Sequence, residues 1–176
     1  MKMSADVSSA DPPLAHPRPP VQVWRFVIAG ALVAILDISF AETYWVVIRN
    51  ATTYARVLQS IASGVLGKSA FQGGSDTVIL GAILHCTVAY GWTAIFLIAA
   101  RHWRAFSRVL AGRYGALKTG FPFGVVVWLV MDLVVMPLSH AKPTPVGSSW
   151  FLVSLLWHPV GVGLPMAVML RGEADR

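Results

Sequence analysis

Four long apolar stretches constrain this chain of 176 residues more than any other feature. A helix needs ~20 predominantly apolar residues to cross the ~30 Å hydrocarbon core of a bilayer. The stretches of about this length cover residues 24–48, 77–100, 120–138 and 149–170. Hydrophobic residues make up 56% of the chain and charged residues only 12%, which is a membrane composition. The sequence therefore predicts an all-α fold, an integral membrane four-helix bundle.

The four stretches leave no room for a separate soluble domain. Residues 24–171 are predicted to form one transmembrane domain, followed by a cytoplasmic C-terminal tail, residues 172–176. Residues 1–23 contain five prolines and no apolar run, so we expect a disordered cytoplasmic tail and not a cleaved signal. The single cysteine, Cys86, lies in the second stretch and has no partner for an internal disulfide.

The basic residues are unevenly divided between the two sides of the predicted bundle. Ten of the 14 lie in the two tails, at the start of the first stretch, or in the loop of residues 101–118. The other four are Arg49, Arg56, Lys68 and Lys142. The positive-inside rule then puts both termini in the cytoplasm, as an even number of spans also requires. The loop of residues 101–118 is expected to contact anionic lipids, and its position argues against nucleic-acid binding.

The segment between the first two stretches is neither apolar enough to span a membrane nor polar enough to be a simple loop. Apolar residues recur there at helical spacing, namely Tyr54, Val57, Leu58, Ile61, Val65 and Leu66. The opposite face is small or polar and includes Gln59, Ser60, Ser63, Gly64 and Gly67. This pattern predicts an additional amphipathic helix, interfacial or re-entrant, whose small face allows close approach to a spanning helix.

Ionisable residues within the stretches are costly in hydrocarbon and normally face the interior of a bundle. They are Asp37, Glu42, His85, Asp132 and His158. At the helical rise of ~1.5 Å per residue, Asp132, His85, His158 and Asp37 lie about 9, 12, 13 and 16 Å from the outer ends of their helices. Glu42 is shallower. Four ionisable groups from four helices at similar depth predict a polar intramembrane cluster of Asp37, His85, Asp132 and His158.

Each of these residues also has a purely structural interpretation. Asp37 can bond a neighbouring Ser or Thr, Glu42 can lie in the headgroup layer, and His85 can bond a backbone carbonyl freed by Pro159. Pro159 and Pro165 interrupt the last stretch, where each proline removes a backbone donor. We expect these two prolines to kink the fourth helix.

Several functions remain open for the cluster. A His and Asp pair is suited to handling protons, because His titrates nearest neutrality. Two His and two Asp also offer ligands for a metal, although no two come from one helix at i, i+3 or i, i+4 spacing. His85 and His158, at matched depth on different helices, offer axial ligands for haem. We predict no metal or other cofactor.

No motif in the chain predicts an enzyme. The nucleophile elbow G-x-S-x-G, the zinc motif H-E-x-x-H and a phosphate-binding loop are all missing from the sequence. The predicted partner is the lipid bilayer. Seven Trp and scattered small residues allow a homo-oligomer without requiring one.

Several motifs together resemble a group of small four-span bacterial membrane proteins of unknown role. They are LDISFA, RVLQSIASGVLGKSAFQGG, ILH, LVMDLVVMPLS and HPVGVGLPMAV, within residues 26–170. The order of a histidine in the second span, a proline after the third and a histidine early in the fourth is also similar to the YagU-like inner-membrane proteins, which are associated with acid resistance. This resemblance implies the bacterial inner membrane and a role under acid stress, and it matches His85 and His158.

Three hypotheses follow from the sequence. The first is proton-linked permeation or sensing through the polar cluster. The second is a structural membrane component, in which the polar groups tie helices together and the basic loop docks a partner or lipid. The third is a membrane protein that binds haem or a metal.

Overall fold

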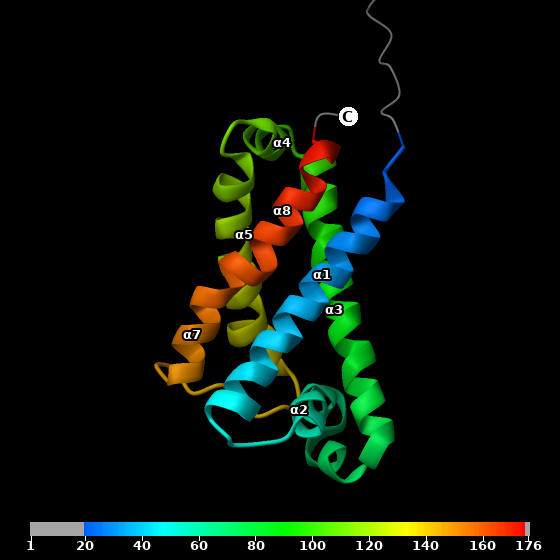
Figure 1. The fold of residues 1–176 in the computed structure, drawn as a ribbon, viewed down its shortest axis with the longest axis vertical. Helices are drawn as coiled ribbons and strands as arrows, with labels where there is room; N and C mark the ends of the chain where they lie inside the picture. Colours follow the sequence, from blue (N-terminus) through cyan, green and yellow to red (C-terminus); the bar gives the residue numbers. More distant parts are fainter. Residues whose placement is uncertain (1–19, 175–176) are drawn as a thin grey trace, which may run out of the picture.

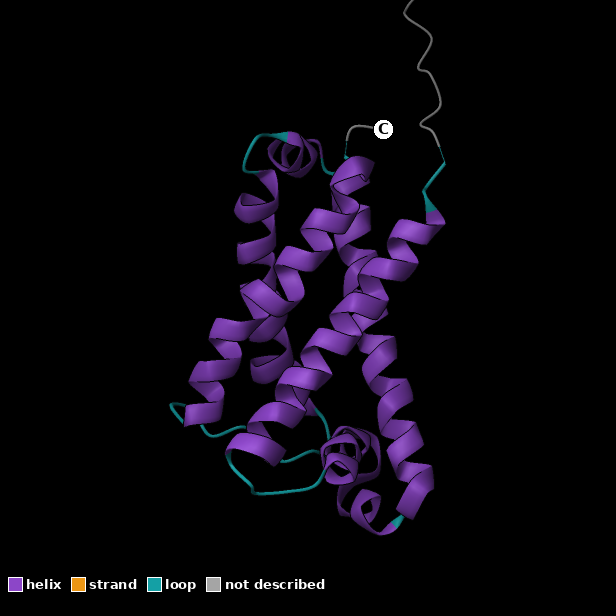
Figure 2. Ribbon diagram, in the orientation of Figure 1, coloured by secondary structure: helices purple, strands orange, loops and turns teal. Residues whose placement is uncertain are grey.

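The computed structural model describes residues 20–174, and this part of the chain is helical with no β-strand (Figures 1 and 2). Four helices are long and apolar enough to cross a membrane. They cover Val23–Ile48, Gly74–His102, Gly115–Leu138 and Ser149–Glu173. This confirms that the four predicted spans are helices. Each helix extends beyond its predicted range at one or both ends. The predicted N-terminal tail lies almost wholly outside the described residues.

The first two long helices are joined by a short helical segment. Helix α1 (Val23–Glu42) continues into a π-helical segment, η1 (Thr43–Ile48), and the second span is the continuous helix α3 (Gly74–His102). Between them lie α2 (Tyr54–Leu66) and the 3₁₀ segment η2 (Gly67–Gln72). A helix thus occupies the segment with the amphipathic pattern, and Thr53 caps it by accepting a hydrogen bond from the backbone N–H of Arg56.

The buried face of α2 is the small and polar one. Its buried residues are Val57, Gln59, Ala62 and Ser63, whereas Tyr54, Val65 and Leu66 are exposed. The close approach to a spanning helix is made at Gly81 of α3, where a Cβ would overlap the carbonyl of Leu58. The side chain of Gln59 donates to the Gly74 carbonyl at 3.2 Å and so joins α2 to the start of α3.

The third and fourth spans are interrupted helices. The third consists of α5 (Gly115–Val130), the π segment η3 (Met131–Val135) and α6 (Met136–Leu138), and α4 (Arg104–Ala111) precedes it. The fourth consists of α7 (Ser149–His158), the π segment η4 (Pro159–Gly163), α8 (Leu164–Leu170) and the 3₁₀ turn η5 (Arg171–Glu173).

The π segments of the third and fourth spans each end two residues before a proline. Segment η3 ends at Val135 before Pro137, and η4 ends at Gly163 before Pro165. A proline lacks the backbone N–H, and its ring clashes with the carbonyl four residues earlier. A wider turn just before the proline relieves that clash. The expected disturbance around Pro159 and Pro165 therefore takes the form of a π turn between α7 and α8.

The fourth span packs between the first and third (Figure 1), with α8 against both α1 and α5. Glycines allow the backbones of α5 and η4 to come very close. A Cβ on Gly163 would overlap the carbonyl of Gly120, and one on Gly124 would overlap the carbonyl of His158. Small residues at a helix interface are the usual means of packing in membranes. Here they hold His158 against the third span.

The apolar core occupies one half of the bundle. We call the end with α4, Val23 and Glu173 the α4 end, and the end with α2 the α2 end (Figure 1). Fully buried core side chains in the half nearer α4 include Phe96, Leu110 and Met166. Large apolar side chains on the outside remain exposed, among them Leu156 at 73%. An apolar exterior of this kind suits contact with lipid.

Candidate functional site: a polar cluster between three helices

Asp37 of α1 and His158 of α7 face each other across a helix interface. Asp37 Oδ1 lies 4.0 Å from His158 Nε2. The His158 side chain is only 13% exposed, whereas that of Asp37 is 30% exposed. At 4.0 Å the contact is electrostatic and longer than a hydrogen bond. The sequence predicted that these two residues lie at similar depth, and the structure brings them together.

The protonation of His158 is constrained by its second nitrogen. Nδ1 lies 2.8 Å from the backbone carbonyl of Ser154. Because a carbonyl only accepts, Nδ1 carries a hydrogen and donates it. In neutral imidazole one nitrogen donates and the other accepts, so Nε2 is then the proton acceptor that faces Asp37. His158 therefore presents an acceptor nitrogen to a carboxyl group.

Asp132 joins the same cluster from the third span. It lies on the π segment η3, and its carboxyl group is near the side chain of Thr144. It is also close enough to His158 and Asp37 for electrostatic interaction with both. Three of the four predicted cluster residues thus lie in one region between three helices.

His85 is placed differently. Its Nε2 donates to the backbone carbonyl of Ala34 on α1, at 2.9 Å. The sequence interpretation had paired this histidine with a carbonyl freed by Pro159, but the carbonyl belongs to the first span. Among the described residues, the ion pairs do not include His85 or Glu42, both of which are half-buried. His85 ties α3 to α1 at one side of the cluster.

The third span departs from regular α-helical geometry at Asp132, and the fourth span does so just after His158. Asp132 lies within η3, and His158 immediately precedes η4, which begins at Pro159. Single π turns inside α-helices are frequent at functional sites. The sequence signal for them was the pair of prolines, Pro137 and Pro165.

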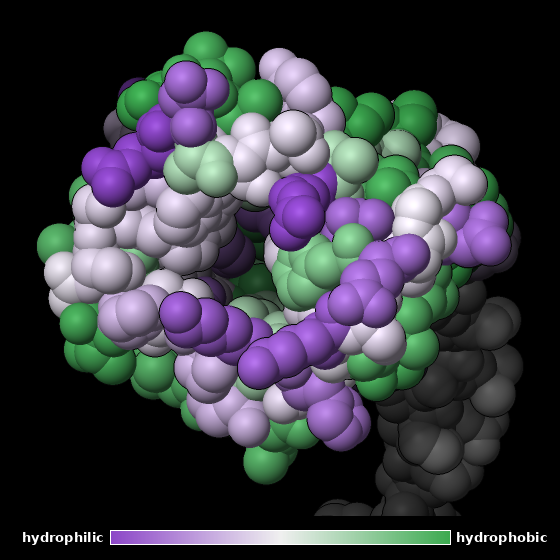
Figure 3. All heavy atoms as spheres, turned by 90° about the horizontal axis from the view of Figure 1, so that it is seen from below, coloured by the Kyte–Doolittle hydropathy of each residue, from purple (hydrophilic) through white to green (hydrophobic). Residues whose placement is uncertain are grey.

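A cavity at the α2 end lies near the cluster but is not lined by its residues. Its volume is about 930 Å³, and its lining includes Thr144, which lies near Asp132. Figure 3 views this end directly and shows a hollow surrounded by hydrophilic side chains. The cavity was not predicted, because its walls come from loops and short helices that are far apart in the sequence.

An aromatic cluster, also missed in the sequence, packs α1 and η1 against α7 beside this cavity. Trp150 lies 5.0 Å from Tyr44 and 5.5 Å from Trp45, measured between ring centroids. Phe40 stacks on Trp157 at 4.5 Å. The position of Trp45 and Trp150 near the outer ends of two spans, where aromatic side chains concentrate in membranes, was the available signal.

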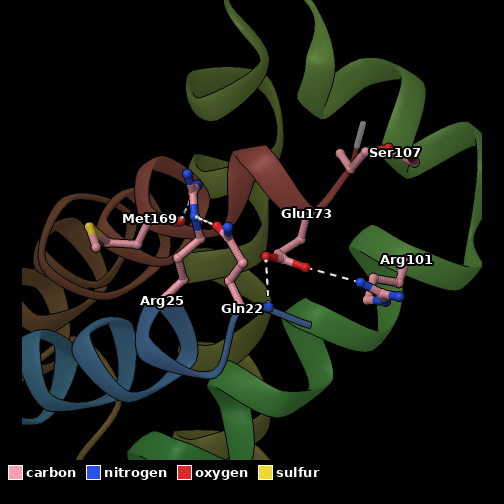
Figure 4. Close-up of polar contacts among 7 residues, drawn as sticks. Gln22, Arg25, Arg101, Ser107, Met169 and Glu173 are labelled. Carbon is pink, nitrogen blue, oxygen red and sulfur yellow. Dashed lines mark hydrogen bonds and ion pairs between the residues drawn. The ribbon is translucent and has the colours of Figure 1, made fainter. Parts of the chain in front are cut away.

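A second polar cluster lies at the α4 end and was likewise missed (Figure 4). Glu173, expected in a C-terminal tail, is fully buried, and its Oε2 lies 3.0 Å from Arg101 Nη1. Its Oε1 accepts a hydrogen bond from the backbone N–H of Gln22 at 3.3 Å. Arg25 donates to the side chain of Gln22 and to the carbonyl of Met169. These contacts join the first, second and fourth spans.

The residues that could hold a metal do not form a complete ligand set. Within residues 20–174, no three His, Cys, Asp or Glu side chains come together in a group suited to a metal ion. The two nitrogens of His158 face Ser154 and Asp37, and the bonded nitrogen of His85 faces Ala34. The donor set therefore gives no support to the haem or metal hypothesis.

Comparisons with known proteins do not place the chain in a family. No protein-family model matches it, and neither curated proteins nor solved structures include a significant match.

Proposed function

We propose that this protein is a multi-pass protein of the bacterial inner membrane, with both termini in the cytoplasm, that takes up protons at Asp37, Asp132 and His158. Four long apolar helices with apolar exteriors support the membrane location. The excess of basic residues at the α4 end supports the orientation. Proton-linked permeation or sensing is the function that this arrangement supports best.

The orientation of His158 is the observation that carries the proposal. With Nδ1 donating to Ser154, Nε2 faces Asp37 as an acceptor. A proton taken up by either group turns this contact of two acceptors into one between a donor and an acceptor. That proton sits either on Nε2 or on the carboxyl group. A site with two alternative positions for one proton is what proton transfer requires.

The surroundings of the cluster differ toward the two ends of the bundle. Thr144, which interacts with Asp132, lines the cavity at the α2 end. Toward the α4 end, the buried core with Phe96, Leu110 and Met166 separates the cluster from solvent. Sensing requires only that protons reach the cluster. Permeation also requires this core to open.

Proton flux into liposomes tests the proposal. We expect wild-type protein to raise flux above that of empty liposomes, and His158→Ala to abolish the increase. His102→Ala is the matched control, because it removes an exposed histidine at the α4 end. Equal flux in wild type and His158→Ala would exclude the histidine from transport.

Sensing is tested separately by titration of the histidine side chains. NMR of protein labelled in its histidine rings, with each signal assigned by substitution, measures the protonation of His158. We expect the His158 ring signals to differ between wild type and Asp37→Asn, because the carboxyl group that faces Nε2 loses its charge. Identical His158 signals in the two proteins would contradict an interaction between these side chains.

A structural membrane component is the second candidate, and the neutral contacts between helices favour it. The Trp128 indole donates to Ser154 Oγ at 2.9 Å, and the hydroxyls of Tyr44 and Ser149 are 2.7 Å apart. In this function the basic loop of residues 101–118 docks a partner or anionic lipid. Oligomeric assembly through small residues is compatible with either function.

A further inference from the structure

The cavity at the α2 end collects positive charge. Four basic residues line it, namely Arg49, Arg56, Lys68 and Lys142. They are the same four that the sequence analysis placed on this side of the bundle. They come from four segments: the end of η1, helix α2, the 3₁₀ segment η2 and the loop after α6. Because the segments are distant in sequence, only the fold brings the four charges together.

These charges have no acidic counterparts in the cavity. Within the described part of the chain, no Asp or Glu lines it, and the ion pairs involve none of the four. Like charges around one hollow repel each other, and a cleft lined by one sign of charge concentrates oppositely charged ligands. An anion bound there relieves the repulsion.

The walls of the cavity are held by contacts between its segments. The backbone N–H of His140 donates to the Gly64 carbonyl at 3.0 Å and fixes the loop after α6 against α2. The Arg56 guanidinium lies over the ring of Phe71, 5.7 Å from its centroid. Trp45 and Trp150 add aromatic surface to the lining. The cavity thus combines positive charge with aromatic and other apolar surface.

We propose that this cavity binds an anion that carries a phosphate group. A phosphate monoester has a charge of about −1.5 to −2 at pH 7 and three acceptor oxygens. It can therefore use two guanidinium groups and two ammonium groups together, whereas a single carboxylate leaves most of the charge unbalanced. The volume of about 930 Å³ suits a ligand larger than inorganic phosphate. A lipid headgroup and a soluble phosphate ester share this chemistry.

Anion binding goes beyond the proposed proton function and does not depend on it. Asp37 and His158 do not line the cavity. The substitution Asp37→Asn is therefore expected to leave anion binding unchanged even where it abolishes proton flux.

Calorimetry on the full chain in detergent tests the soluble source, with glycerol 3-phosphate as the probe. We expect Arg49→Gln/Arg56→Gln to weaken binding about tenfold for each arginine removed. The matched control, Arg104→Gln/Arg113→Gln, removes two exposed arginines from the α4 end and should bind as wild type does. Arg49→Lys/Arg56→Lys keeps the charge and is expected to retain most of the affinity, which separates lost binding from misfolding.

Native mass spectrometry tests the lipid source, after reconstitution with phosphatidylglycerol and phosphatidylcholine. Phosphatidylglycerol retained by wild type and the α4-end control, but lost from Arg49→Gln/Arg56→Gln, assigns the cavity to a lipid headgroup. The proposal is overturned when neither probe distinguishes wild type from that double variant. It is also overturned when succinate, a dicarboxylate, binds more tightly than glycerol 3-phosphate.

Discussion

At the scale of the residue, the two intramembrane histidines differ in what their ring nitrogens contact. His85 donates to a backbone carbonyl of the first span, which is a neutral tie between helices. His158 donates with one nitrogen and presents the other to Asp37. The same residue type thus makes a backbone contact in one case and faces a carboxyl group in the other, where we propose proton uptake.

Asp132→Asn tests whether the carboxylates of the cluster serve more than packing. Asn retains an acceptor oxygen near Thr144 but loses the charge. Because polar contacts in membranes contribute only about 0.6 kcal/mol on average, we expect the detergent melting temperature to change little. We expect proton flux to fall about a hundredfold, the effect of losing one positioned proton-transfer group at the low end of its range. A large loss of stability with unchanged flux would instead favour the structural function.

At the scale of the element, the interrupted helices position the cluster. The π segments η3 and η4 precede Pro137 and Pro165, and η4 packs closely against α5. An extra residue in a turn changes the direction of the side chains beyond it. Gly120, Gly124 and Gly163 then allow the backbones to touch at His158.

Gly163→Ala tests this close approach. The added methyl would overlap the Gly120 carbonyl, so we expect a destabilisation of about 1–3 kcal/mol, measured as thermal unfolding in detergent. Gly91→Ala is the matched control, because no atom lies within 4 Å of its added Cβ and Ala favours a helix. Equal melting temperatures for the two variants would contradict the packing at Gly163.

At the scale of the whole molecule, the two ends of the bundle differ. The α2 end has a hollow lined by basic side chains, whereas the α4 end is closed by Glu173 and its partners (Figures 3 and 4). Glu173 connects the end of the fourth span to Arg101 of α3 and to the chain just before α1. This contact fixes the three helices relative to each other.

Glu173→Gln tests the importance of this contact for stability. Gln retains an acceptor for the Gln22 N–H but loses the ion pair with Arg101, so we expect a loss of about 2–3 kcal/mol. Glu42→Gln, at a half-buried glutamate near the α2 end, serves as the control with a small expected effect. Thermal melts in detergent compare the two. A Glu173→Gln variant as stable as wild type would mean that the pair contributes nothing to stability.

The sequence by itself determined the four long helices and the depth of their ionisable residues. Length and apolarity decide whether a helix can span a membrane, and depth follows from a fixed rise per residue. It could not determine which way each side chain faces around its helix. His85 and His158 were therefore both placed in the predicted cluster, although only His158 lies beside Asp37.

Only the tertiary structure determined which residues contact each other. The rotation of each helix depends on how its neighbours pack and on π turns that shift the helical phase. The burial of Glu173 depends on the second span and on the chain just before α1, while the basic cavity depends on four segments that are separate in sequence. Contacts of this kind are long-range, so local sequence patterns contain no direct signal for them.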